Sequence, residues 1–500
     1  MSARTGRVGS PAVVRTLPPV PFVDVAAAVG AEVRGAPESA RVADAFLDSR
    51  RVTAGSMFFC VPGERTDGHD HAAEAVAAGA VGVVVERWLD VDVPQARVPS
   101  VRAAMGTMAA VVHGRPARSL DLIGVTGTNG KTTVTYLLEA ILERAGRTSG
   151  VIGTTGARVA GAPVPLERTT PEAPDLQRLL ARMRDGGVSA VAMEVSSHAL
   201  AQHRVVGVEY DVAMFTNLSQ DHLDLHGSME NYFDTKARLF TPDHARSGVV
   251  NADDAWGRRL ASSSTVPIDT FAVDREADVR ATDVVVDASG IAFSVGEVRV
   301  RSALRGRFNV SNAVGALAVA RRLGIDPVEA AVAVGSVLDV PGRMEPVHAG
   351  QAFLVMVDYA HTPDSILGVL RASRPLTAGR LIVVFGCGGD RDRAKRPSMG
   401  RAATGVADLT VLTSDNPRSE DPLQILAEVE AGAAEGGGAY VVRPDRREAI
   451  RLGLTEARPG DVVVIAGKGH ETVQELRDGP VPFDDRRVAE EELAELVERP

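Results

Sequence analysis

The amino-acid sequence predicts an α/β protein of three domains. Short apolar runs typical of strands alternate with segments that carry apolar residues at helical spacing, and this alternation begins near Leu120 and again after Gly342. The 500 residues are also too many for one hydrophobic core. We therefore expect a flexible tail at 1–21 and α/β domains at 22–118, 119–341 and 342–500.

The predicted N-terminal domain is small. A helix-like stretch rich in Ala and Val is accompanied by two strand-like runs, Ser56–Val61 and Val81–Val85. Polar residues gather in Asp48-Ser49-Arg50 and again at 63–68. By themselves these two stretches are typical of turns.

The central domain begins with a strand, a glycine turn and a helix. The strand-like run Leu122–Val125 meets the turn Gly127-Thr128-Asn129-Gly130, and a helix with regularly spaced apolar residues begins at Lys131. Such turns bind phosphate because backbone N–H groups and the helix N-terminus face the anion. Lys131 would supply a cation for the terminal phosphates, and Thr132 a ligand for Mg²⁺. The common P-loop pattern has Gly where this chain has Val125, but the flanking strand and helix still predict ATP or GTP binding.

Two further strands of this domain end in polar residues. Ala190–Met193 runs into Glu194, and Val212–Phe215 runs into a segment that ends at His222. Ligands of parallel α/β sheets lie beyond the carboxyl ends of the strands. Glu194 and His222 are therefore candidate metal groups near the phosphates.

The rest of the central domain carries less chemistry. Residues 253–305 are expected to be β-rich, and an Ala-rich helix is expected at 313–323. Asn309 and Asn312 precede that helix, where they could simply serve as caps.

The C-terminal domain is predicted to be Rossmann-like. Its predicted strands, each followed by a charged signature, are Phe353–Val357, Leu381–Phe385, Asp408–Leu412 and Asp461–Ile465. Strands separated by helical lengths imply a parallel sheet. No dinucleotide fingerprint follows the first strand, which argues against a nicotinamide cofactor. Strand ends rich in Asp, Arg, Lys and His imply a charged substrate that bears carboxylates.

Composition excludes several classes of function. The net charge of −10 argues against a nucleic-acid or anionic-membrane surface, and no apolar run approaches the length of a membrane span. The start of the chain lacks the apolar core of a signal peptide. Cys60 and Cys387 form neither a disulfide framework nor a zinc set, so we expect a cytoplasmic protein.

The motifs taken in order resemble a known family. After the glycine turn come EVSSH, TNLSQDHLDLHG, GRFNVSN, DYAHTP and GCGGDRD. This ordered set closely resembles the Mur ligases of peptidoglycan synthesis, from about residue 22 onward. The resemblance implies a UDP-sugar-binding domain, a P-loop ATPase-like domain and a Rossmann-like domain that brings the incoming amino acid. It also implies amide formation through an acyl phosphate made from ATP.

Within that family the chain resembles the members that add meso-2,6-diaminopimelate to UDP-MurNAc-L-Ala-D-Glu. The ATP residues that the resemblance implies are Gly127, Thr128, Asn129, Gly130, Lys131, Thr132, Thr133, Asn312 and Asp358. The implied Mg²⁺ ligands are Thr132, Glu194, His222 and Lys236, the last as a carbamate formed from CO₂. Lys131, Lys236, His222 and Glu194 are the implied catalytic residues.

The resemblance also assigns residues to the two other substrates. The UDP-MurNAc-peptide would contact Leu47, Ser49, Thr169, Thr170, Ser196, Gln202 and Arg204. In an extended segment Gln202 and Arg204 would point the same way, and Arg168 stands where the family often has asparagine. Diaminopimelate would contact Arg391, Asp415, Asn416, Pro417, Arg418, Gly467 and Glu471.

Arg418 is the residue expected to select the amino acid. Diaminopimelate differs from lysine by one far carboxylate, which a guanidinium can bind bidentately, and the DNPR motif is associated with diaminopimelate enzymes. The alternatives are an L-lysine-adding ligase, a folylpolyglutamate synthase-like ligase, and a P-loop regulatory NTPase of a different class. We expect a monomer that binds no nucleic acid and that closes its domains around the substrates.

Overall fold

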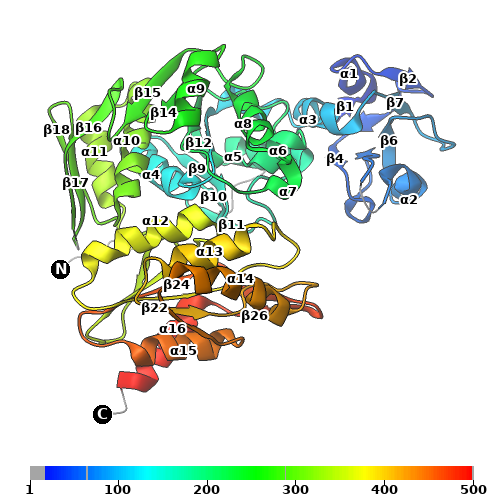
Figure 1. Ribbon diagram of the computed structural model, residues 1–500. Coiled ribbons are helices and arrows are strands. Elements are labelled where there is room, and N and C mark those ends of the chain that lie inside the picture. The colour runs from blue at the N-terminus through cyan, green and yellow to red at the C-terminus, as the bar shows by residue number, and fades with distance from the viewer. Residues whose placement is uncertain (1–16, 64–65, 288, 498–500) are drawn as a thin grey trace, which may run out of the picture.

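The computed structural model describes residues 17–63, 66–287 and 289–497, which form an N-terminal, a central and a C-terminal α/β domain (Figure 1). Most of the tail predicted at 1–21 lies outside these ranges. Its last two residues are not a tail, because β1 (Val20–Pro21) pairs antiparallel with β3 (Arg41–Val42). The three main sheets lie inside the predicted domain ranges, and the exact bounds of the domains stay a prediction.

The N-terminal domain is a five-stranded sheet with three short helices. Its strands, in the order of the sheet, are β2 (Glu32–Arg34), β7 (Gln95–Arg97), β6 (Ala80–Val85), β5 (Ser56–Phe59) and β4 (Asp44–Phe46). Its helices are α1 (Phe22–Ala27), α2 (Ala72–Ala77) and α3 (Val101–Val112). Short 3₁₀ turns lie at Ser49–Arg51, where the Asp48 carboxylate accepts the Arg50 N–H, and at Gly68–His71. Both strands predicted in this part are confirmed.

The central domain is an eleven-stranded sheet. Its parallel centre runs in the order β9 (Ser149–Gly153), β12 (Ala190–Glu194), β8 (Asp121–Thr126), β13 (Val212–Phe215), β14 (Gly248–Asn251) and β15 (Ile268–Ala272). One edge continues into β10 (Gly156–Val159) and β11 (Ala162–Val164), and the other into β16 (Val279–Asp287), β17 (Gly290–Val295) and β18 (Val298–Ser302).

Helices cover both faces of this sheet because its strands are apolar on both sides. On β8, Ile123 and Val125 face one core and Leu122 faces the other. The first core is covered by α4 (Lys131–Arg144), α10 (Arg307–Arg322) and α11 (Pro327–Ser336). The second is covered by α5 (Ala173–Asp185), α6 (Ser197–Ala201), α8 (Met229–Ala237) and α9 (Ala255–Ser263). The short α7 (Leu223–His226) and the 3₁₀ turns Pro116–Ser119 and Arg238–Phe240 complete the domain.

The prediction that residues 253–305 are β-rich is confirmed, since β15 to β18 lie within them. The same range also contains α9, which begins where the Asp254 carboxylate accepts the Gly257 N–H. The prediction for the next helix was wrong at its start. Helix α10 begins at Arg307 and not at Ala313, with Gly306 as its N-cap. Asn309 and Asn312 therefore lie inside the helix, so the suggestion that they are caps is wrong.

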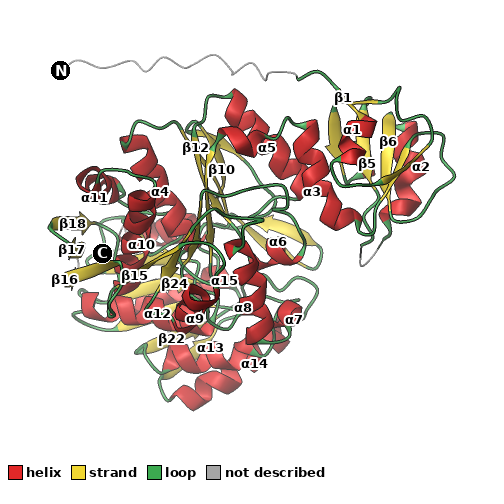
Figure 2. Cartoon of the chain, turned by 90° about the horizontal axis from the view of Figure 1, so that it is seen from above, coloured by secondary structure: helices red, strands yellow, loops and turns green. Residues whose placement is uncertain are grey.

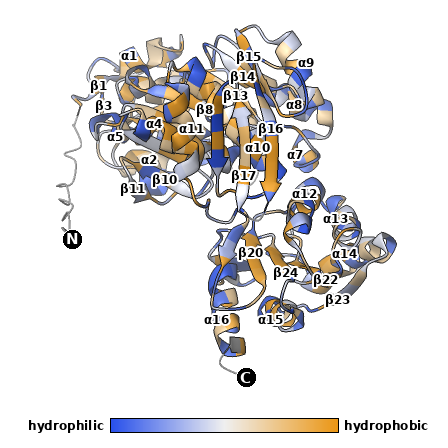
Figure 3. Cartoon of the chain, turned by 90° about the vertical axis from the view of Figure 1, so that its left-hand side faces the viewer, coloured by the Kyte–Doolittle hydropathy of each residue, from blue (hydrophilic) through white to orange (hydrophobic). Residues whose placement is uncertain are grey.

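The C-terminal domain has the predicted Rossmann-like arrangement. Its sheet runs in the order β19 (Glu345–Val347), β20 (Leu354–Asp358), β24 (Val462–Ala466), β21 (Leu381–Phe385), β22 (Leu409–Leu412) and β23 (Ala439–Val442), with only β19 antiparallel. One face is covered by α12 (Pro363–Ser373), α13 (Lys395–Thr404) and α14 (Pro422–Gly436), the other by α15 (Arg446–Glu456) and α16 (Asp485–Val497). A 3₁₀ turn (Arg374–Leu376) and the hairpin of β25 (Val473–Leu476) and β26 (Gly479–Pro482) complete it. Figure 3 shows the apolar colour on β20 and β24, the strands buried between these layers.

The N-terminal domain lies at the edge of the central domain in both Figure 1 and Figure 2, and its helix α3 contacts α5 of the central domain. The C-terminal domain lies against a different side of the central domain, with α12 and α13 nearest to it (Figure 1). Within the described ranges, none of the helices combines the length and the apolar character needed to cross a bilayer.

Candidate active site

The glycine turn lies at the carboxyl end of β8, in the middle of the central sheet. Gly127 has φ 143°, and a Cβ there would lie 1.9 Å from Oγ1 of Thr216, so only glycine fits. Gly130 is the N-cap of α4, and no side chain caps this helix. The first N–H groups of α4 are therefore available to an anion.

Two lysine amines lie against this turn. Lys131 Nζ donates to the carbonyl oxygens of Gly127 (2.9 Å) and Thr128 (2.8 Å), and Lys236 Nζ donates to the Gly127 oxygen (2.9 Å). Burial lowers the pKa of Lys131, although the charges of Glu194 and Asp221 oppose the shift. Burial, together with the charge of Lys131, lowers the pKa of Lys236 well below its usual value.

Lys236 is buried by its position on α8. Its side chain is 1% exposed, and its Nζ lies 4.7 Å from the centre of the Tyr232 ring, one turn earlier on the same helix. From the local sequence alone a lysine here would be expected in solvent. Tertiary packing turns it into a desolvated amine beside the phosphate turn.

Glu194 and His222 flank the turn from the strands on either side of β8. The Glu194 carboxylate accepts the backbone N–H of Thr154 (2.9 Å) and its hydroxyl (3.0 Å). His222 follows β13, and its Nε2 lies 3.2 Å from Oδ2 of Asp221. Burial lowers the pKa of His222 to about 3, so the ring is neutral near pH 7. Glu194 and His222 thus lie at or beyond the carboxyl ends of β12 and β13, as expected.

A cavity of about 700 Å³ opens over the turn, between the central and C-terminal domains. It brings together all the predicted ATP and Mg²⁺ residues: Gly127, Thr128, Asn129, Gly130, Lys131, Thr132, Thr133, Glu194, His222, Lys236, Asn312 and Asp358. It is also lined by Thr169, Thr170, Ser196, Arg204, Arg391, Arg418 and Glu471. The remaining predicted site residues, which do not line it, are Leu47, Ser49, Gln202, Asp415, Asn416, Pro417 and Gly467.

Asn312 and Asp358, the predicted ATP residues outside the glycine turn and helix α4, have buried polar partners. Asn312 Nδ2 donates to Oδ1 of Asn309 (2.8 Å), one turn earlier on α10. Asp358, at the end of β20, accepts the N–H groups of Met344 (2.7 Å) and Ala360 (2.8 Å). Burial raises the pKa of Asp358.

The residues predicted for the UDP-sugar peptide are split between two places. Leu47 and Ser49 lie in the N-terminal domain, where the Ser49 hydroxyl donates to Glu74 (2.9 Å). Thr170 lies in the cavity wall, where its hydroxyl donates to the Glu194 carbonyl oxygen (2.9 Å). The Ser196 hydroxyl accepts the Ala199 N–H and so caps α6.

The expectation of an extended segment at Gln202 and Arg204 was wrong. Helix α6 ends at Ala201, and His203 has a left-handed φ of 55°. The two side chains still meet, because Arg204 Nη2 donates to Oε1 of Gln202 at 2.5 Å.

The predicted amino-acid residues form a front and a back layer. Arg418 lines the cavity, its Nε 2.5 Å from Oε2 of Glu475 and its Nη1 donating to the Gly389 oxygen (2.8 Å). Behind it, Asn416 Nδ2 donates to Oε2 of Glu471 (2.8 Å). Gly467 comes so close to Asp415 that a Cβ there would lie 2.3 Å from the carboxylate. Asp415, Asn416, Pro417 and Gly467 thus lie behind the cavity wall rather than in it.

Sequence reasoning missed several residues that organise the site. Lys468 is fully buried, and its Nζ donates to Asn416 (3.0 Å) and Glu471 (3.0 Å). Arg343 comes from the predicted domain boundary, and its Nη2 donates to Thr132 Oγ1 (3.1 Å). Lys468 lies in the charged stretch after the predicted strand Asp461–Ile465, and Arg343 follows Gly342, the predicted start of the C-terminal domain. No local signal distinguished them, since their partners lie far away in the chain.

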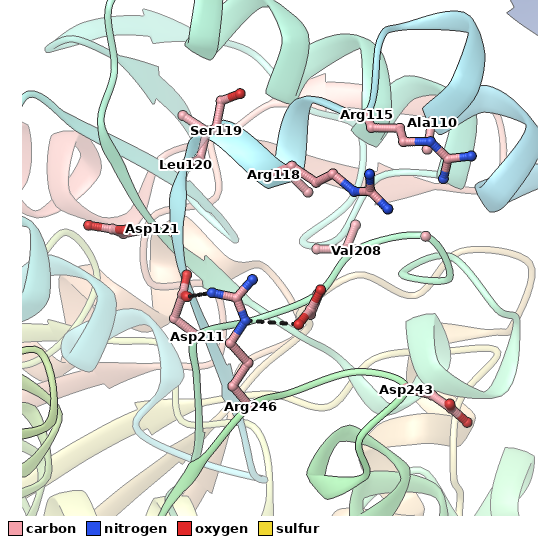
Figure 4. A pocket seen from close by; sticks show the side chains of 13 residues that line it. Ala110, Arg115, Arg118, Ser119, Leu120, Asp121, Val208, Asp211, Asp243 and Arg246 are labelled. Atoms are coloured by element: carbon pink, nitrogen blue, oxygen red, sulfur yellow. Dashed lines mark hydrogen bonds and ion pairs between the residues drawn. The ribbon is translucent and has the colours of Figure 1, made fainter.

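A second cavity, of about 450 Å³, lies at the opposite ends of the strands (Figure 4). Asp121 and Asp211, next to the starts of β8 and β13, lie in its wall, and Arg246 pairs there with Glu209 and Asp211 (2.8 Å each). None of the residues that the sequence predicts for a site lines it. Because parallel sheets bind ligands at the carboxyl ends of their strands, the first cavity is the candidate active site.

Comparison with known proteins identifies the family. Residues 45–116 match the Mur ligase family catalytic domain, 125–320 the Mur ligase middle domain, and 342–469 the Mur ligase glutamate ligase domain. The chain belongs to the Mur ligase family.

Relatives match this Mur ligase over nearly its whole length. The UDP-N-acetylmuramoyl-L-alanyl-D-glutamate–2,6-diaminopimelate ligase of Geobacillus thermodenitrificans is 49% identical over 454 residues, covering 89% of this chain and 93% of the relative. The ligase of the same name from Streptomyces avermitilis is 46% identical over 490 residues, covering 95% of this chain and 96% of the relative.

Solved structures agree with this assignment. A structure of a UDP-N-acetylmuramoyl-L-alanyl-D-glutamate–2,6-diaminopimelate ligase has a TM-score of 0.68 and 34% identity, covering 96% of this Mur ligase and 100% of that chain. MurF from Acinetobacter baumannii has a TM-score of 0.67 at 20% identity, covering 97% of this chain and 100% of its own, and so shares the fold. The predicted three-domain α/β fold of a Mur ligase is confirmed.

Proposed function

We propose that this Mur ligase adds meso-2,6-diaminopimelate to the D-Glu γ-carboxylate of UDP-MurNAc-L-Ala-D-Glu, using ATP, in peptidoglycan synthesis. The products are the UDP-MurNAc-tripeptide, ADP and phosphate. The observation that carries the proposal is the position of Arg418, which lines the same cavity as the phosphate turn. The names of the full-length relatives point to the same substrate.

The phosphate turn supports transfer of a phosphoryl group to a carboxylate. A carboxylate is a poor electrophile because its charge repels nucleophiles and oxide is a poor leaving group. Conversion to an acyl phosphate removes both obstacles, and the amine then attacks the carbonyl carbon. The protein's part is to hold two anions together, for which the uncapped start of α4 and the amine of Lys131 provide positive charge.

The surroundings of Lys236 fit a carbamate. Carbamate formation requires a neutral amine, and burial lowers the pKa of Lys236 in that direction. The described residues contain no cluster of three or more His, Cys, Asp or Glu side chains that could hold a metal ion. A carbamate on Lys236 would add oxygen ligands, which Mg²⁺ prefers, to those of Thr132, Glu194 and His222. When bound, Mg²⁺ would neutralise charge on the phosphates.

Charged residues of the C-terminal domain support diaminopimelate as the amino-acid substrate. Arg418 and Arg391 line the cavity as cations for carboxylates, and Glu471 lines it as an anion for the far ammonium. Lys468 and Asn416 hold Glu471 in place. A lysine substrate would offer no far carboxylate to the remaining N–H groups of Arg418, which disfavours that substrate.

The test is phosphate release by the purified protein with ATP, Mg²⁺ and UDP-MurNAc-L-Ala-D-Glu, with meso-diaminopimelate, L-lysine or no amine. Product masses are measured in parallel. Phosphate release and a tripeptide product only with diaminopimelate are expected. A product with lysine instead would overturn the specificity, and release that ignores the amine would favour a regulatory NTPase. Activity only with a folate substrate would favour a folylpolyglutamate synthase-like ligase.

A further inference from the structure

Glu172 is a buried carboxylate where the N-terminal domain meets the central domain. It is the residue just before α5 and is 6% exposed. Glu172 is at the N-cap position, where a side-chain oxygen can accept a backbone N–H, but its side chain makes no such hydrogen bond. Its carboxylate therefore serves other partners, since an unpaired buried charge is strongly unfavourable.

Those partners are arginines from three separate segments. Oε2 of Glu172 accepts a hydrogen bond from Nη1 of Arg102, on α3, at 3.1 Å. Oε1 lies 3.0 Å from Nε of Arg204, which follows α6, and 3.9 Å from Nη1 of Arg168. The Nε–H of Arg204 has no acceptor in line, so its contact with Glu172 is chiefly one of opposite charges.

Two of these arginines belong to the cavity wall, whereas Glu172 lies behind it. Arg168 and Arg204 line the active-site cavity, next to Thr169 and Thr170. Arg204 is 8% exposed and donates to the Thr170 carbonyl oxygen (3.2 Å). Without Glu172, three guanidinium groups would share this small region with no buried anion between them, and they would repel one another.

The same helix turn also docks the N-terminal domain. Asp175 pairs with Arg51 (2.9 Å), and Arg178 pairs with Asp44 (2.8 Å). Glu172, Asp175 and Arg178 are spaced by three and lie on one side of α5. Glu172 is the member of this row that also contacts the cavity wall.

We propose that Glu172 is a positioning residue for the UDP-MurNAc-peptide. It holds Arg204 and Arg168 toward the anionic substrate, and through Arg102 it ties helix α3 of the N-terminal domain to this wall. The contacts for the two ends of this long substrate, one set in each domain, would thereby be held at a fixed distance from each other. This inference rests on the proposed function, because it takes Arg204 as a substrate contact.

The test compares Glu172→Gln with Asp175→Asn in steady-state kinetics. Glu172→Gln should raise KM for UDP-MurNAc-L-Ala-D-Glu about 10- to 100-fold, while kcat and the KM values for ATP and diaminopimelate stay within about threefold. Asp175→Asn also removes a carboxylate that docks the N-terminal domain, but Asp175 does not touch Arg204. It should therefore raise KM for UDP-MurNAc-L-Ala-D-Glu by less than about threefold and leave the other two KM values unchanged. Glu172→Asp keeps the charge and should restore part of the loss.

A double variant separates positioning from general damage. In an Arg204→Gln background, Glu172→Gln should add less than about threefold to KM, because the two residues act as a unit. Additive effects, parallel increases in all three KM values, or an unchanged KM for the UDP-substrate would each overturn the inference. If Glu172→Gln does not fold, Glu172→Asp is compared in the same way. Failure of the wild-type protein to make the tripeptide would instead refute the proposed function.

Discussion

Replacing Arg418 with lysine keeps the positive charge but removes the planar pair of donors. Arg418 has a left-handed φ of 54°, which lysine adopts at a similar cost in backbone strain. The substitution therefore changes the side chain while the backbone strain energy stays nearly constant. We expect Arg418→Lys to weaken the use of diaminopimelate far more than the use of ATP.

The size of the effect follows from the contacts of the guanidinium. Nε faces Glu475 and one N–H of Nη1 donates to the Gly389 oxygen, which leaves one N–H on Nη1 and two on Nη2 for a substrate carboxylate. A single ammonium cannot reproduce two parallel hydrogen bonds. The loss of one charge-assisted hydrogen bond costs about 1.5–3 kcal/mol, or about 10- to 150-fold in kcat/KM.

The assay is phosphate release with diaminopimelate varied at saturating ATP, and then with ATP varied. Arg443→Lys is the matched control, because Arg443 is an exposed arginine of the same domain that does not line the cavity. We expect only Arg418→Lys to lower kcat/KM for diaminopimelate. Equal losses for diaminopimelate and ATP, or none, would refute the role of Arg418 in specificity.

Three further outcomes are expected. Lys236→Ala should lower activity about 100-fold or more, and an added short carboxylic acid should restore part of it. Activity equal to wild type would refute the carbamate assignment. Gly130→Ala and Gly146→Ala should both lower the unfolding free energy because of their left-handed φ angles of 88° and 76°; the backbone strain costs about 1–2 kcal/mol in each, and Gly130→Ala should lose more because its Cβ also clashes. Only the first should raise KM for ATP, since its Cβ would lie 2.4 Å from Oδ1 of Asn312 while the second meets open space; equal KM values would contradict this. Burial lowers the pKa of His470 from 6.5 to about 4, so as pH falls through this range the unfolded chain binds a proton that the folded protein does not. Unfolding temperatures should therefore fall less steeply from pH 7 to about 4.5 in His470→Asn than in wild type, and identical slopes would show that this ring does not contribute.

Local patterns in the sequence were enough to predict the framework of the site. The strand, glycine turn and helix from Leu122 to Arg144 appear as β8, the turn and α4. The four strands predicted in the C-terminal domain appear as β20, β21, β22 and β24. These predictions succeed because side-chain periodicity and the conformational freedom of glycine act over only a few residues.

Where the local pattern was weak, the prediction was wrong or incomplete. Helix α10 begins at Arg307, because Gly306 and not an asparagine is its N-cap. Strand β23 was not predicted, since Ala439–Val442 is a short, partly exposed edge strand with little periodicity. Residues 202–204 do not form the expected extended segment, because His203 adopts a left-handed φ.

Tertiary structure alone decided the environment of the charged groups. The local sequence presents Lys236, Arg343 and Glu172 as ordinary polar residues of a helix, a turn and a helix start, and only the family resemblance singles out Lys236. Packing buried the first beside Gly127, brought the second to Thr132, and surrounded the third with arginines. The physical reason is that burial and ion pairing depend on residues that are distant in the chain and meet only when the domains have folded and docked.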